Sequence, residues 1–125
     1  MKPILSFSLI AAFALGLAAD LTPEAVLKDA AKHDGKEVTI AGKIEKLERK
    51  TSRAGNKYFV FQLKGEKEIV NVYGRGELAE EWKNGAKAVV NGIFRKEKKL
   101  SNFTVKNEVD VSAKEGKKYG VRKPE

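Results

Sequence analysis

Residues 57–73 of the chain read KYFVFQLKGEKEIVNVY, and this stretch is the strongest indication of the fold. On either side of a short polar turn, apolar residues recur at every second position, which is the pattern of two half-buried strands joined as a hairpin. If Lys64 faces Lys67, apolar residues oppose one another on one face, and Tyr58 opposes Tyr73 on the other. The stretch therefore predicts an antiparallel hairpin with one face in a core and a tyrosine pair on its outer face.

Three further alternating stretches extend this hairpin into a larger β-structure. Residues 38–44 predict a strand, and because the apolar period slips by one residue beyond it, we expect a bulge at residues 45–46. Residues 88–94 repeat the pattern of 38–44, glycine on glycine, which predicts two neighbouring strands that coil round one barrel. Residues 103–111 alternate cleanly and predict a last strand with Phe103 on its apolar face.

Two helical segments accompany the strands. Residues 22–24 read TPE, which combines a capping threonine, a proline for the first helical position and an acid for the positive helix end, so residues 20–35 predict an N-terminal helix. Residues 77–84 predict a second short helix. Leu78 and Trp82 would lie on one side of it and plug the end of the barrel.

The N-terminus has the pattern of a secretory signal. Met1 and Lys2 form a short positive start, residues 3–19 carry no charge, and small residues close the stretch at Gly16, Ala18 and Ala19. We expect cleavage and a periplasmic or secreted mature protein that does not insert stably into a membrane. An uncleaved anchor is the alternative, at the lower limit of length for crossing a bilayer.

Composition narrows the classes of function. The 125 residues include 25 lysines and arginines against 17 acids, a formal net charge of +8, so we expect an anionic partner. The chain has no cysteine, which excludes disulfide scaffolds, thiolate metal sites and cysteine nucleophiles. It has one histidine, His33. Glu108 and Asp110 are expected to face outward as ordinary surface charges. We therefore expect no enzyme activity, no cofactor and no metal site.

Strand order and sequence together resemble a known fold family. Three strands, a plug helix and two further strands are the order of the OB-fold, an all-β five-stranded Greek-key barrel. Residues 38–44 (VTIAGKI), 55–63 (GNKYFVFQL) and 69–74 (IVNVYG) resemble nucleic-acid-binding OB domains of the type attached to tRNA synthetases, helicases and polymerases. The expected organisation is a signal peptide (1–19), an N-terminal helix (20–35), an OB-fold barrel (36–113) and a flexible basic tail (114–125).

The resemblance implies a site on the outer face of the second and third strands, between the loop that joins strands one and two and the loop that joins strands four and five. Cations fall in both loops, whereas the acids of residues 77–84 are expected elsewhere. Tyrosine rings on the sheet would stack on bases. The predicted nucleic-acid-binding residues are Arg49, Lys50, Arg53, Lys57, Tyr58, Asn71, Tyr73, Arg75, Arg95, Lys96, Lys98 and Lys99.

These features predict an exported protein that binds single-stranded nucleic acid, DNA or RNA, with little sequence specificity. The cationic loops would contact phosphates and the tyrosines would contact bases. In the alternative interpretation, the chain is an envelope or stress-related module that binds another anionic polymer, a small ligand or a protein partner.

Overall fold

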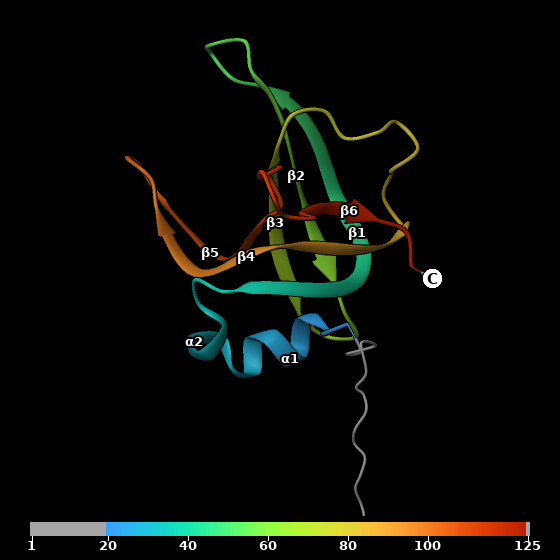
Figure 1. Ribbon diagram of the computed structural model, residues 1–125, viewed down its shortest axis with the longest axis vertical. Coiled ribbons are helices and arrows are strands. Elements are labelled where there is room, and N and C mark those ends of the chain that lie inside the picture. Colours follow the sequence, from blue (N-terminus) through green and yellow to red (C-terminus); the bar gives the residue numbers. More distant parts are fainter. Residues whose placement is uncertain (1–19, 125) are drawn as a thin grey trace, which may run out of the picture.

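A computed structural model describes residues 20–124, so the predicted signal peptide lies outside the described residues (Figure 1). No helix among residues 20–124 has the length and apolar character needed to cross a bilayer. The elements are α1 (Pro23–Lys28), α2 (Ala30–His33), β1 (Glu37–Thr51), β2 (Lys57–Lys64), β3 (Ile69–Arg75), β4 (Lys87–Lys99), β5 (Thr104–Asp110) and β6 (Gly120–Arg122).

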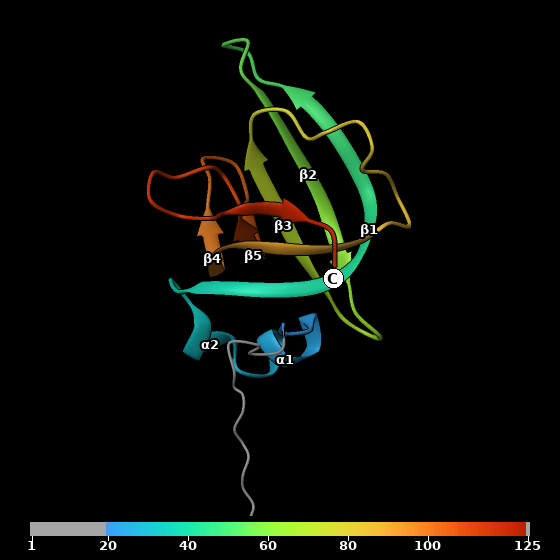
Figure 2. The same cartoon turned by 45° about the vertical axis from the view of Figure 1, so that its right-hand side comes forward.

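Five of the strands close into a barrel. They follow one another in the order β1-β2-β3-β5-β4, and β4 pairs again with β1. Only the β3–β5 pairing is parallel among the described strands, and the others are antiparallel. Figures 1 and 2 show how strongly β1 curves in order to pair with β2 at one end and β4 at the other. The predicted all-β OB-fold barrel is confirmed.

The curvature of β1 has two local causes that the sequence predicted. The β1–β2 register slips by one residue between Glu45 and Glu48, and Lys46 has a positive φ of 54°, so the predicted bulge is present. Gly42 of β1 allows a close crossing of strands, because a Cβ there would lie only 2.8 Å from the backbone oxygen of Lys64. The two similar strands are neighbours as predicted, with Ile40 opposite Val90.

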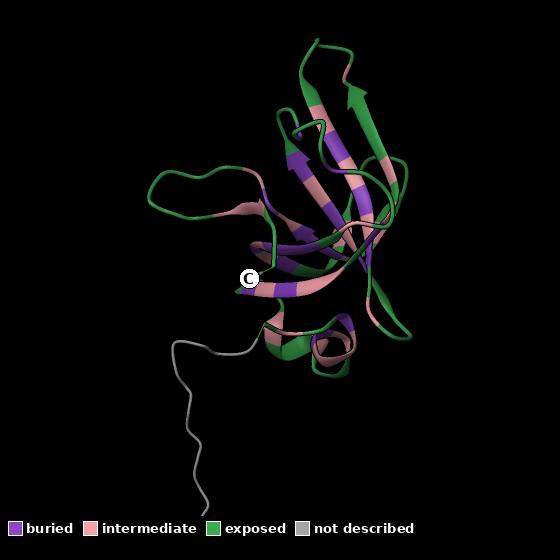
Figure 3. Cartoon of the chain, turned by 90° about the vertical axis from the view of Figure 1, so that its right-hand side faces the viewer, coloured by how far each residue is buried: buried purple, intermediate pink, exposed green. Residues whose placement is uncertain are grey.

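Buried side chains alternate along β2 and β3, so that one face of each strand fills the barrel (Figure 3). Phe94, Ile40, Ile44 and Leu63 are among the largest side chains that are completely buried. Burial of each such side chain contributes roughly 1.5–3 kcal/mol. The hydrophobic effect on this inner face therefore holds the sheet closed and leaves the outer face available for other roles.

The predicted plug helix is wrong, although the plug itself is present. Residues 77–84 form an irregular loop with turns, shown in yellow in Figure 1 beside β1. Leu78 and Trp82 are buried within the core cluster, as expected. The four-residue spacing of two apolar side chains therefore indicated burial correctly, but it did not require a helix, because a loop can bury two side chains at the same spacing.

The hairpin register also differs from the prediction. The observed pairs set Lys64 opposite Ile69 and Val60 opposite Tyr73, which shifts the partner of each β2 residue by two positions. The reason is a longer turn, closed by a 2.8 Å hydrogen bond from the Gly65 amide to the Glu68 carbonyl. A shift of two positions keeps every side chain on its expected face. Tyr58 is consequently a diagonal neighbour of Tyr73 on the outer face.

Two stretches near the C-terminus differ from their expected conformation. Asn107 has a positive φ of 54° and breaks the alternation expected for residues 103–111. As a result Phe103 is 60% exposed, so its predicted place in the core is wrong. In the predicted flexible tail, β6 pairs with β4 and sets Val121 opposite Val90.

Candidate functional site

A tyrosine pair lies on the outer face of β2 and β3. The ring centroids of Tyr58 and Tyr73 are 5.9 Å apart with planes tilted by 41°, and both side chains are half-buried. Lys98 reaches across from β4 and places its Nζ 4.7 Å from the centroid of the Tyr73 ring. The arrangement is a cation–π contact on a small aromatic platform.

A buried carboxylate fixes Lys98 in this position. Glu108 is only 6% exposed, and its Oε1 lies 3.1 Å from Lys98 Nζ. Glu108 is on the outer face as expected, but the expectation of an ordinary exposed charge is wrong because neighbouring groups cover it. Asn71 on the adjacent strand donates from its Nδ2 to the Lys106 carbonyl over 2.8 Å, so its amide is also used within the sheet.

Two hollows lie along this face. One, of about 520 Å³, lies over Tyr58 and Tyr73 and is also lined by Arg75. The other, of about 260 Å³, lies further along the same strands and is lined by Val60, Val105, Asn71 and Glu108, among others. We call the two hollows together the outer groove. Its surface combines aromatic rings, aliphatic side chains and a few cations, which is the usual composition of a ligand site.

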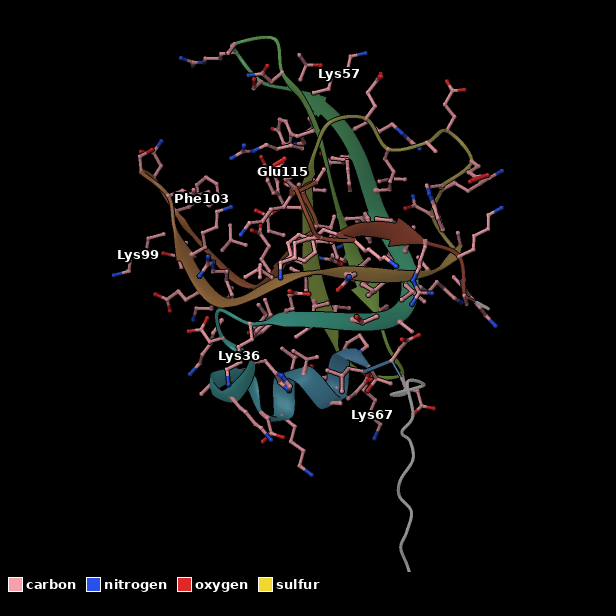
Figure 4. The ribbon with its side chains drawn as sticks, in the orientation of Figure 1. Lys36, Lys57, Lys67, Lys99, Phe103 and Glu115 are labelled. Atoms are coloured by element: carbon pink, nitrogen blue, oxygen red, sulfur yellow. The ribbon has the colours of Figure 1, made fainter. Side chains whose placement is uncertain are left out.

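The hairpin between β4 and β5 carries exposed apolar side chains. Phe103 is 60% exposed and Leu100 is 42% exposed, and the Leu100 amide donates to the Phe103 carbonyl over 2.8 Å. Figure 4 shows Phe103 and Lys99 on this arm, which projects away from the barrel. The arm therefore presents two apolar side chains to solvent.

Arg49, a predicted ligand-binding residue, instead holds the plug loop. Its Nη2 donates to the carbonyls of Ala79 at 2.7 Å and Trp82 at 2.9 Å, and its Nε donates to the carbonyl of Leu78 at 3.3 Å. These bonds occupy the guanidinium within the protein. Arg53, in the turn between β1 and β2, is exposed to solvent.

The other two cations of the first loop pair with acids. Lys57 lies 2.8 Å from Glu77, which raises the pKa of Lys57 and lowers the pKa of Glu77 through a hydrogen bond and charge attraction. Lys50 lies 3.1 Å from Glu48, and this hydrogen bond and charge raise the pKa of Lys50. The expectation that the acids of residues 77–84 lie away from the cationic loop is therefore wrong.

Among the predicted cations of β3 and β4, only some reach the outer groove. Arg75 and Lys98 border it, and Lys99 lies on the exposed arm. Arg95 lines a separate hollow toward the tail, together with Tyr119. The Lys96 amide donates to Asp34 Oδ1, which places that residue's backbone against the end of α2.

The site residues predicted from the sequence do not include several side chains of the outer groove and of the exposed arm. Val60 and Val105 contribute aliphatic surface, while Leu100 and Phe103 form the exposed arm. Val60 was on the predicted outer face, two residues after Tyr58 on the same strand. Its position could therefore have placed it among the predicted site residues. The positions of Val105 and Phe103 follow from the irregular backbone at Asn107, for which the local sequence contains no signal.

Side chains that could coordinate a metal are few. Within residues 20–124 no group of three or more histidine, cysteine or acidic side chains is arranged to hold an ion. His33 lies on α2, which contacts β4 from outside the barrel. Tyr58 and Tyr73 bring two phenol oxygens to the region of the outer groove.

Comparison with protein families changes the interpretation of this face. A family model described as the CcmE domain matches residues 17–119, which includes the whole barrel and ends immediately before β6. No curated protein matches the chain.

The match overturns the resemblance proposed from the sequence. The three stretches that resembled nucleic-acid-binding OB domains are strand sequences shared by the fold, so they identified the barrel but not its ligand. The prediction that the chain binds single-stranded DNA or RNA is wrong, and so is the predicted nucleic-acid partner. Because the matched residues span most of its length, the chain belongs to the CcmE domain family.

Proposed function

We propose that the chain binds heme in the outer groove and acts as a heme chaperone in cytochrome c maturation. The CcmE family is one of heme-binding chaperones that work with other proteins of this pathway, which supports the proposal. The structural observation that carries it is the half-buried pair of Tyr58 and Tyr73 beneath an open hollow. We further propose that the protein is a carrier in the cell envelope rather than an enzyme.

The groove has the chemistry that a porphyrin requires. Heme is a flat apolar ring with two carboxylates on one edge, so its site needs aromatic or aliphatic surface beside a cation. The rings of Tyr58 and Tyr73 and the side chain of Val60 supply that surface. Arg75 at the edge of the larger hollow would pair with the carboxylates.

The available donors limit how the heme iron is held. Histidine, cysteine, methionine and tyrosine are the side chains that usually ligate heme iron. Within residues 20–124 these are His33, Tyr58, Tyr73 and Tyr119, since the chain has no cysteine and its one methionine begins the sequence. The groove thus offers phenol oxygens, and His33 lies on α2 outside the barrel. We propose that a groove tyrosine ligates the iron.

Titration with hemin tests the proposal. Soret absorbance should saturate at one hemin per chain, and Tyr58→Ala with Tyr73→Ala should weaken binding at least tenfold. Tyr58→Phe with Tyr73→Phe keeps the rings but removes both oxygens, so it should alter the ferric spectrum more than the affinity. Tyr119→Phe, outside the groove, is the matched control and should change neither quantity. Undiminished affinity in the double alanine variant would place the heme elsewhere.

A further inference from the structure

Three lysines form a row on the outer surface at the opposite end of the barrel from the tyrosine platform. Lys43 of β1 lies opposite Lys64 of β2 on one side and opposite Lys87 of β4 on the other. Because neighbouring strands are about 4.8 Å apart, the row spans roughly 10 Å. Each lysine is exposed and adjoins a fully buried residue in sequence, so the three side chains point away from the core. We call these residues the lysine row.

The row is costly for the fold, because like charges directly opposite one another destabilise a sheet. Within residues 20–124 no carboxylate lies within ion-pair distance of the three lysines. Glu45 lines the same hollow of about 420 Å³ as the three lysines, together with the apolar residue Pro124. Because none of the three described lysines is in an ion pair, their charges are available to an external anion.

The beginning of the described chain lies beside this row. Leu21 pairs with β1 through hydrogen bonds to the Thr39 carbonyl and from the Ala41 amide, both 2.9 Å long. Glu24 contacts the hairpin next to Lys64, where its Oε2 accepts bonds from two backbone amides at 2.7 Å. Figures 1 and 2 show the start of α1 at the same end as the β2–β3 hairpin, and Figure 4 shows Lys67 there, far from Lys57 and Lys99.

Position and charge together identify the anion. The sequence before residue 20 has 17 consecutive uncharged residues, 3–19, which is the pattern of a secretory signal or, in the alternative interpretation, of a membrane anchor. If that segment is retained, residue 20 lies at the bilayer surface, and the lysine row lies within a few residues' length of it. We propose that the lysine row binds the phosphate groups of anionic lipids, which turns this end of the barrel toward the membrane and the outer groove away from it.

Vesicle binding tests this proposal directly. Within residues 20–124 the core cluster runs from Val26 to Val111, and the five barrel strands lie between residues 37 and 110. A fragment of residues 20–125 therefore contains the complete barrel and is used for this measurement. Each lysine near an anionic surface raises partitioning about fivefold, so Lys43→Gln, Lys64→Gln and Lys87→Gln together should lower binding to phosphatidylglycerol-containing vesicles about a hundredfold. The control combines Arg53→Gln, Lys99→Gln and Lys106→Gln, which removes the same charge from the β1–β2 turn and the β4–β5 arm, away from the lysine row. An equal loss in both triple variants would reduce the effect to net charge and overturn the proposal.

A second measurement uses the full chain in nanodiscs. Amine acetylation read by mass spectrometry should fall about fivefold at the three row lysines when phosphatidylglycerol replaces part of the phosphatidylcholine. Lys99 should be acetylated equally in both. Unchanged acetylation of the row would refute lipid contact. Protection by inorganic phosphate in detergent solution without anionic lipid would also overturn the proposal, because it would show a site for the free anion.

Discussion

Replacing Arg49 with methionine should loosen the plug loop without touching the outer groove. The substitution keeps an aliphatic stem but removes the donors that bind the carbonyls of Leu78, Ala79 and Trp82. A hydrogen bond from a charged donor contributes about 1.5–3 kcal/mol when well enclosed. Here the guanidinium is exposed and water replaces part of what is lost, so we expect a total loss of about 2 kcal/mol. For a domain of this size, that corresponds to a fall of roughly 10 °C in Tm.

The chain offers a direct readout of this effect, because Trp82 is its only tryptophan and lies in the plug loop. Urea unfolding followed by Trp82 emission should show a lower midpoint for Arg49→Met, and the folded-state emission should shift toward that of an exposed indole. Arg53→Met is the matched control in the same loop region and should change stability by less than about 0.5 kcal/mol. Equal stability of the two variants would refute the structural role assigned to Arg49.

Three further substitutions test other parts of the structure. Gly92→Ala should cost at least about 3 kcal/mol, measured by urea unfolding, because its Cβ would overlap the Asp110 carbonyl oxygen. Glu24→Gln should lower stability at neutral pH, because two backbone amides hold the pKa of Glu24 below its ordinary value of 4.5. That difference should be full above pH 4.5 and vanish as the pH falls through the lowered pKa. Lys98→Met should cost about 1–3 kcal/mol by leaving Glu108 covered without its partner, and adding Glu108→Gln should restore part of the loss.

Each of these three predictions has a control or a result that would contradict it. Gly85 has a φ of +91° with open space around it, so Gly85→Ala should cost only the backbone strain of about 1–2 kcal/mol. Glu66→Gln, on the hairpin that Glu24 contacts, should not change how the free energy of unfolding depends on pH below neutrality. For Lys98, a cycle without any coupling between the two single variants would contradict the ion pair.

Regular alternation explains why so much of the barrel could be predicted. In β2 and β3 the alternation of apolar and polar residues shows which face is buried. A register shift of two positions leaves that assignment intact. The bulge near Lys46 was also visible, because an extra residue must shift the apolar period. Burial patterns in strands are local, so they can be inferred without knowledge of the partner strand.

Irregular backbone explains where prediction failed. Leu78 and Trp82 are buried, but the backbone between them is held by Arg49 from a distant strand, and the spacing alone was equally compatible with a helix. The positive φ at Asn107 reverses the expected outcome for Phe103, which is exposed on an arm beyond the barrel. Both features depend on contacts between segments far apart in sequence, which a local period does not contain.

The predicted nucleic acid and the proposed heme make similar demands on a protein surface, so the sequence alone did not separate them. Both present flat π systems beside negative charges, so tyrosines with lysines predict either one. The difference lies in the state of the cations, since a polymer track needs a continuous series of accessible charges along the groove. Lys57 and Lys50 are paired with acids, and Arg49 is bound to carbonyls, so the series is interrupted. A compact platform with a few cations at its edge suits one small ligand carrying two carboxylates better than it suits a strand of phosphates.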